Sequence, residues 1–360
     1  MHLERALEPS TDWVKLQALL PDGWEEQALL CGALKFGRKF TPESLLRTLL
    51  MYLCEDASMV TIVERARGGD VVDISDVALL KRMNKSGEWL RWICERLVND
   101  TSSALLSERR LIAVDGSTIS DPYSKTATWR LHYALDIASL RCHEAHVTPF
   151  STGETFTLFN FAKGDVIIAD RGFATRKNIN HVLDAGSDVL VRMNLASLPL
   201  YDNNGKKFNQ LEYLRHLNVG EYGECSAHNE GTPGQIPVRV CAYRKTLEQQ
   251  SESERKLLNR DSKRQTKSRP ETREATAYVV VVTTLKEYTA EQILQLYQHR
   301  WQVELAFKRM KSLLGLSKLK KKNPEGAKAW IQGKLLVAFL IERLIAAGDH
   351  FPPVIQERHN

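Results

Sequence analysis

Two short apolar runs that each end in an aspartate constrain the fold of this chain most strongly. The first is Leu111–Val114, followed by Asp115, and the second is Val166–Ala169, followed by Asp170. Short runs of aliphatic and β-branched residues bounded by polar residues are typical of buried strands. In open α/β sheets, ligands bind at the edge where such strands end. The sequence therefore predicts two carboxylates at one edge of a buried sheet.

A third acidic residue, Glu304, lies in a predicted helix. At about 100° per residue, an apolar stripe of this helix contains Leu296, Val303, Phe307, Met310 and Leu314. An adjacent ridge, roughly 21 Å long, contains Tyr297, Arg300, Glu304, Lys308 and Lys311. A solvated face with i,i+4 pairs is the simpler explanation of such a ridge. The two strands that end in aspartate favour the other one, in which three carboxylates bind a divalent cation beside a polyanion.

The charge of the chain is concentrated in two stretches. The 360 residues carry a net charge of +6, but residues 255–273 carry +6 and residues 308–322 carry +7, so the rest is mildly acidic. Clustered positive charge on an acidic body indicates an anionic partner, most simply nucleic acid. Either stretch alone is equally consistent with a solvated loop.

The cysteines and histidines do not predict a metal centre. Six cysteines without a C-x-x-C pair argue against a zinc ribbon and are typical of reduced thiols in a cytoplasm. In Cys142–His146, the two histidines are three residues apart, and in a regular strand they would point to opposite faces. We interpret this segment as an incidental surface strand. No secretory signal or membrane-spanning run is apparent, so we expect a soluble, cytoplasmic protein.

The periodicity of the chain changes along its length and predicts an α/β protein with five segments. Residues 1–105 form a helical N-terminal region, which is either a DNA-binding helix-turn-helix or a plain bundle with Trp89 and Trp92 in its core. We favour DNA contact because of the cations in these helices: Lys81, Arg82, Lys85, Arg91 and Arg96. The remaining segments are a mixed sheet with helices on its faces (106–196), a β-rich insertion (197–288), the Glu304 helix (289–322) and a helical C-terminal region (323–360).

The three acidic residues and their neighbours resemble the DDE transposases of bacterial insertion sequences. The branch similar to IS4 has the helix motif Y-x2-R-x3-E-x6-K, which Tyr297, Arg300, Glu304 and Lys311 match without a change in spacing. Further similar segments are Ala113–Ser117, Ala169–Phe173, Trp129–His132, Gly153–Thr155 and Val282–Leu285. The resemblance covers residues 70 to 350 and implies a ribonuclease-H-like fold with a β-strand insertion before the last catalytic helix.

The resemblance also implies a reaction and its partners. Asp115, Asp170 and Glu304 would bind two Mg²⁺ ions, for which Mn²⁺ can substitute, and catalyse in-line phosphoryl transfer on DNA. Contacts to DNA phosphates are expected from Tyr297, Arg300, Lys311, Lys308 and Arg171. The substrates would be double-stranded terminal inverted repeats and target DNA, handled by a homodimer in a bacterial cytoplasm, associated with the nucleoid and without a membrane partner. Two alternatives share these residues: a ribonuclease-H-like nuclease that only hydrolyses, and a DNA-binding derivative that no longer catalyses.

Overall fold

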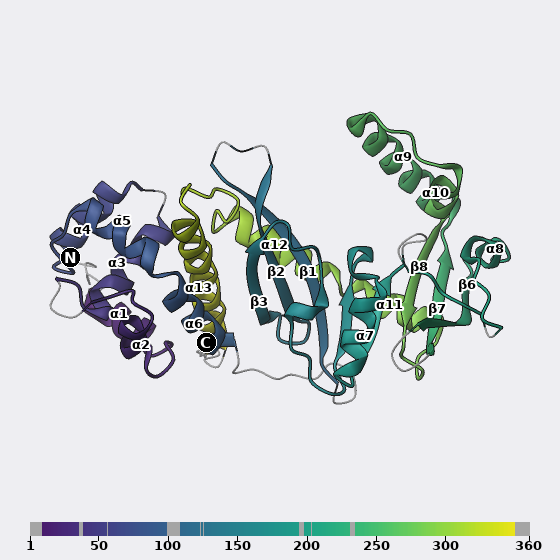
Figure 1. Cartoon of the computed structure of the whole chain (residues 1–360), viewed down its shortest axis with the longest axis horizontal. Coiled ribbons are helices and arrows are strands. Elements are labelled where there is room, and N and C mark those ends of the chain that lie inside the picture. Colours follow the sequence, from purple (N-terminus) through teal and green to yellow (C-terminus); the bar gives the residue numbers. More distant parts are fainter. Residues whose placement is uncertain are drawn as a thin grey trace, which may run out of the picture.

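The computed structural model shows an elongated molecule built on one large sheet (Figure 1). It describes residues 9–35, 39–55, 57–98, 109–122, 124, 126–193, 198–202, 204–230 and 235–349. Helices from both ends of the chain gather at one end of the molecule, and the last strands of the sheet lie at the other (Figure 1). The predicted boundaries near residues 105 and 196 and the last eleven residues lie outside the described part of the chain.

The sheet has eight strands in the order β3-β2-β1-β4-β5-β8-β7-β6. Its strands are β1 (Leu111–Ser120), β2 (Ala127–Asp136), β3 (Arg141–Pro149), β4 (Val166–Ala169), β5 (Asp188–Arg192), β6 (Tyr222–Glu230), β7 (Gln235–Arg244) and β8 (Tyr278–Thr283). An antiparallel meander, β1 to β3, is followed by β4 and β5, which run parallel to β1. This mixed sheet with helices on its faces confirms the predicted fold class.

The β-rich insertion continues the sheet instead of forming a separate body. β8 pairs with β5 on one side and with β7 on the other, both antiparallel. Between β7 and β8 the chain leaves the sheet as α9 (Leu247–Arg264) and α10 (Pro270–Glu274), and α9 projects away from the body (Figure 1). The basic stretch that begins at Arg255 therefore includes a helical arm. β6 was not predicted, because its sequence alternates only weakly between polar and apolar residues.

Alternation along the strands gives the sheet an apolar core on each face. On one face Leu111, Ala113 and Ile168 pack with the N-terminal helices, α11 (Ala290–Gln298), α12 (Trp301–Ser312) and α13 (Pro324–Asp349). On the other face Ile112 and Val114 pack with α7 (Arg176–Asp184), α8 (Gln210–Arg215) and the 3-10 turns η1 (Phe156–Leu158) and η2 (Arg171–Phe173). A third 3-10 turn, η3 (Ala275–Ala277), precedes β8.

Side-chain caps mark the start of three of the N-terminal helices. The N-terminal helices are α1 (Pro9–Gln17), α2 (Trp24–Leu30), α3 (Pro42–Cys54), α4 (Met59–Gly68), α5 (Asp76–Lys85) and α6 (Gly87–Val98). The side chains of Thr41, Ser58 and Ser75 cap α3, α4 and α5 by accepting from backbone N–H groups. Helix α13 packs against α3, α5 and α6, so the two ends of the chain share one bundle.

Of the two tryptophans that a plain bundle would place in its core, Trp89 and Trp92, only Trp89 is fully buried. Trp89 stacks on Trp24 with ring centroids 6.2 Å apart, and donates its indole N–H to the Trp24 carbonyl oxygen at 2.7 Å. Trp92 is only half-buried, and Arg96 lies over its ring. DNA contact by this region stays a prediction. Among the described residues, no helix is both long enough and apolar enough to cross a membrane.

Candidate active site

Asp115 and Asp170 each follow one of two residues that are in register on adjacent parallel strands, Asp115 within β1 and Asp170 directly after β4. Val114 of β1 is in register with Ala169 of β4, and each aspartate is the next residue along the chain. Neighbouring strands are separated by roughly 4.8 Å. Because Val114 faces the core around α7, alternation turns Asp115 towards the face covered by α12. Asp170 lies near the same helices, since its charge acts on Tyr297 and Arg300.

The sequence predicted that the first strand ends at Asp115, and this prediction was wrong. β1 continues to Ser120, because it stays paired with β2 as far as Ser120 opposite Ala127. The shorter neighbour β4 stops at Ala169, so Asp115 lies where one edge of β1 becomes free. The carboxylate therefore still lies at a rim, formed by the unequal lengths of two strands.

The two aspartates are crowded with negative charge. Burial is the main cause that raises the pKa of Asp115 to about 6, and the charges of Glu154 and Asp170 act in the same direction. The Gly116 N–H, which donates to Asp115 Oδ1 at 2.7 Å, and Arg300 lower it. Asp170 Oδ1 is buried and accepts no hydrogen bond. A buried carboxylate oxygen without a donor is a suitable ligand for a cation.

The predicted helix around Glu304 is divided into two. α11 ends at Gln298 and α12 begins at Trp301, so Glu304 lies in the first turn of α12 and not in the middle of one helix. The link is wound more tightly, because His299, Arg300, Gln302 and Val303 each donate to a carbonyl oxygen three residues earlier. The predicted apolar stripe is confirmed, since Leu296, Val303, Phe307 and Met310 are buried and Leu314 is partly buried.

Arg300 occupies the centre of the helix motif. Its guanidinium pairs with Glu304 at 2.8 Å and lies over the Tyr297 ring, 5.8 Å from the ring centroid. The charge of Asp170 also acts on Arg300. Tyr297 is only 8% exposed, and its hydroxyl has no hydrogen-bond partner. The Arg300 guanidinium therefore packs on the ring of a buried tyrosine.

Asp115 and Glu304 line one open cavity of about 540 Å³, together with Ser117, Lys308 and Lys311. Asp170 is not among the lining residues. Among the described residues, no three acidic, histidine or cysteine side chains are gathered closely enough to form a ready-made metal site. The Glu304 carboxylate is instead held in the ion pair with Arg300.

The remaining predicted DNA contacts differ in their exposure. Arg171, which follows Asp170, and Lys308 are exposed, and Lys311 is half-buried beside the cavity. Trp301, to which the sequence assigned no role, is 57% exposed and so is not a core residue.

Glu154 lies at the site although the sequence assigned it no role. It pairs with Arg130 of β2 at 3.3 Å and interacts electrostatically with both aspartates. It precedes η1 in a loop, and its only sequence signal was the family-like segment Gly153–Thr155.

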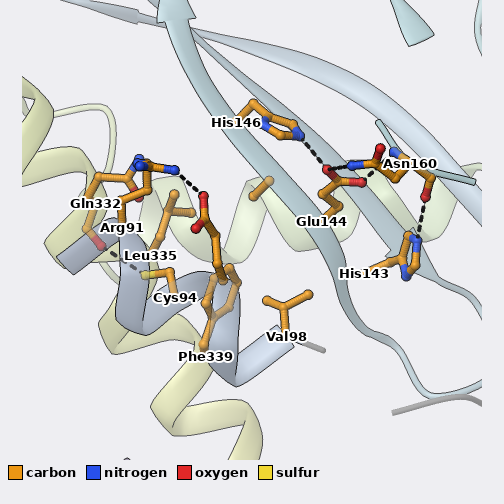
Figure 2. Close-up of a pocket in the computed structure, with 12 residues that line it drawn as sticks. Arg91, Cys94, Val98, His143, Glu144, His146, Asn160, Gln332, Leu335 and Phe339 are labelled. Atoms are coloured by element: carbon orange, nitrogen blue, oxygen red, sulfur yellow. Dashed lines mark hydrogen bonds and ion pairs between the residues drawn. The ribbon is translucent and has the colours of Figure 1, made fainter. Parts of the chain in front are cut away.

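The histidines of Cys142–His146 both line a separate cavity of about 370 Å³ between β3, α6 and α13 (Figure 2). The prediction that they point to opposite faces was wrong, because β3 has one extra residue, His143, opposite the bond between Ala134 and Leu135. Glu144 accepts from the Asn160 N–H at 2.8 Å and is hydrogen-bonded to His146 Nε2 at 2.8 Å (Figure 2). These contacts give the segment a structural role.

Comparison with known proteins assigns this arrangement to a family. A model of the transposase DDE domain matches residues 106–340, which include the aspartates, Glu304 and the whole sheet. This chain belongs to the DDE transposase family. Such proteins are enzymes that cleave and join DNA, and the family in general uses divalent metal ions.

Two relatives show how far the similarity to DDE transposases extends. The transposase for insertion sequence element IS421 of Escherichia coli is 35% identical over 82% of this chain and 83% of its own. The InsL protein for element IS186A of Escherichia coli strain K12 is 34% identical over 92% of this chain and 93% of its own. A piggyBac transposase synaptic complex with hairpin DNA aligns over 95% of this chain and 80% of its own, with 10% identity and a TM-score of 0.41.

Proposed function

We propose that this DDE transposase cuts DNA at the terminal inverted repeats of an insertion sequence and joins the freed 3′ ends to target DNA. Asp115, Asp170 and Glu304 are the proposed catalytic residues and ligands of two Mg²⁺ ions, which Mn²⁺ can replace. The observation that supports this proposal is the register of β1 and β4, in which Asp115 and Asp170 follow the paired residues Val114 and Ala169. Glu304 shares a cavity with Asp115.

The donor set fits divalent cations. All three side chains offer carboxylate oxygens, which Mg²⁺ prefers. Burial raises the pKa of Asp115, the charges of Glu154 and Asp170 raise it further, and Asp170 Oδ1 has no donor. A cation bound between the two carboxylates would offset both effects. When bound, such ions activate the attacking hydroxyl or water and stabilise the leaving oxygen of a phosphodiester.

The basic residues of the ridge position the DNA. Lys308 and Lys311 line the cavity that contains Asp115 and Glu304, so a phosphate in this cavity would lie next to the carboxylates. Arg171 follows Asp170 and is exposed at the same rim. Tyr297 is the fifth predicted contact, and its ring would hold the Arg300 guanidinium in position for the phosphate.

Arg300 connects DNA binding to the assembly of the three carboxylates. In the free protein it holds Glu304 through the ion pair at 2.8 Å. A phosphate can accept two hydrogen bonds from a guanidinium and so replaces a carboxylate well. Binding of the DNA end would therefore take Arg300 from Glu304 and free this carboxylate to join the aspartates. Two subunits, one for each transposon end, would complete the reaction as a homodimer.

The decisive experiment uses Asp170→Asn and Glu304→Gln in a plasmid assay with paired inverted repeats. Both variants should lose Mg²⁺-dependent cleavage and strand transfer by about a thousandfold or more, while binding the ends normally. Full activity in either variant would refute the assignment of the carboxylates. Cleavage without joined products in the wild type would indicate a hydrolytic nuclease, and end binding without cleavage would indicate a DNA-binding derivative.

A further inference from the structure

Glu154 is enclosed by elements that carry the two aspartates. Its side chain lies against Gly116, which follows Asp115, and against Gly172, two residues after Asp170. A Cβ atom built on Gly116 would lie 3.3 Å from Glu154 Cγ, and one built on Gly172 would overlap Glu154 Oε2 and lie 3.0 Å from Cδ. The absence of side chains at these two glycines therefore makes room for this carboxylate.

The backbone that carries Glu154 is fastened to the turn after Asp170. Asn178 of α7 is buried, and its side-chain oxygen accepts from the Phe156 N–H and the Thr155 hydroxyl, both at 3.0 Å. Its amide nitrogen donates to the Phe173 carbonyl oxygen at 3.1 Å. The rings of Phe156 and Phe173 stack with centroids 4.8 Å apart. The Glu154 loop and η2 are therefore joined through Asn178 and the stacked rings.

Arg130 holds the carboxylate of Glu154 from β2. The pair is 3.3 Å apart, with side-chain exposures of 12% for Arg130 and 32% for Glu154, and the guanidinium lies over the Phe150 ring. The charge of Glu154 acts on Asp115, and the charge of Asp170 acts on Glu154. Burial raises the pKa of Glu154, Arg130 lowers it, and the charge of Asp170 raises it, so the ion pair offsets part of the cost of placing a carboxylate here.

We propose that Glu154 is a positioning residue of the catalytic centre. Its carboxylate, held by Arg130 and seated on Gly172, fixes the turn that follows Asp170 and adds negative charge beside the two aspartates, so that a divalent cation binds more tightly. This inference rests on the proposed function, because it assumes that Asp115 and Asp170 bind the cation. Glu154 is not one of the three proposed metal ligands, so the inference adds a fourth acidic residue to the catalytic centre.

The test measures Mn²⁺ binding to the full chain without DNA by titration calorimetry. Glu154→Gln should weaken Mn²⁺ binding by about tenfold or more, as expected for residues that orient metal ligands, with little change in thermal unfolding. Gly172→Ala retains every charge but displaces the carboxylate, and it should weaken binding in the same direction. Glu224→Gln removes a carboxylate that also pairs with an arginine, Arg239, at the far end of the sheet, and should have no effect.

The outcomes separate this inference from the proposed function. If the wild type binds Mn²⁺ and Glu154→Gln binds it equally well, Glu154 has no positioning role, although the triad assignment survives. If Asp115→Asn and Asp170→Asn leave Mn²⁺ binding intact, the triad assignment itself fails. Should Glu154→Gln unfold, Gly172→Ala decides the question, and normal binding in a folded Gly172→Ala variant would overturn the proposal.

Discussion

Arg300 Nη2 lies 2.8 Å from Glu304 Oε1, so two residues of the helix motif are paired with each other in the free protein. The glutamate is 44% exposed at its side chain, whereas the arginine is 15% exposed and has a buried Nε without a partner. Glu304 can also be hydrated by solvent, whereas the buried Nε of Arg300 has no hydrogen-bond partner. A DNA phosphate can improve the hydrogen bonding of Arg300 and release Glu304 at the same time.

Replacing Arg300 by Gln should therefore separate DNA binding from cation binding. Affinity for a transposon end should fall by about tenfold, because one charge-assisted phosphate contact is lost. Mn²⁺ binding to the DNA-free protein should become several-fold tighter, because Glu304 is released and a positive charge beside Asp115 is removed. Gel-shift and calorimetric titrations measure the two effects. Weaker Mn²⁺ binding in this variant would contradict a competition between Arg300 and the cation.

Lys311 provides a direct test of the phosphate contact at the cavity. Lys311→Glu should weaken binding of a transposon end and flatten its dependence on salt, with the slope of log K against log salt falling by at least about 1. Lys286→Gln, at an exposed lysine after β8, is the control and should change neither quantity. An unchanged slope for Lys311→Glu would exclude the phosphate contact.

The sequence predicted the site well where the pattern of a single strand or helix determines it. The apolar runs before Asp115 and Asp170 specified two buried strands, and the apolar stripe of α12 specified which side packs. The strand ends depended on neighbours, because β1 continues past Asp115 only through pairing with β2.

Features that depend on long-range contacts could not be predicted. The division between α11 and α12 has no proline or glycine to mark it. The extra residue at His143 is visible only against β2. Glu154 packs beside Gly116 and Gly172 because these residues, distant from it in sequence, lack side chains.

Packing between the two ends of the chain can be tested at Gly333 of α13. A Cβ atom built on Gly333 would overlap the side chain of Leu53, which is fully buried in α3. Gly333→Ala should therefore lower the free energy of unfolding by about 1–3 kcal/mol, although alanine favours a helix. Gly68→Ala, at a helical glycine with open space around it, should instead be neutral or raise stability by up to about 1 kcal/mol. Denaturant titrations of both variants provide the comparison, and equal effects would rule out the overlap.

Glu342 of α13 should make stability depend on pH. Burial is the main cause that raises the pKa of Glu342 to about 7, against the lowering effects of the Cys142 N–H, the Tyr133 hydroxyl and two arginines, Arg141 and Arg309. A raised folded-state pKa means that the folded state prefers the protonated acid. Below the unfolded-state pKa, near 4.5, the carboxyl is protonated in both states, so it does not lower the free energy of unfolding. The penalty for ionising it grows as the pH rises and is complete above about 7.

Glu342→Gln removes this penalty, so its stability relative to the wild type should rise from pH 4.5 to 7.5 by up to about 3 kcal/mol. Glu144→Gln is the matched control of opposite sign. Burial alone would raise the pKa of Glu144, but hydrogen bonds from His146 and the Asn160 N–H lower this pKa overall. That substitution should cost most stability above pH 4.5 and less as the pH falls through the lowered pKa. Urea unfolding across this pH range measures both differences, and parallel curves for wild type and Glu342→Gln would show that this carboxyl does not resist ionisation in the folded protein.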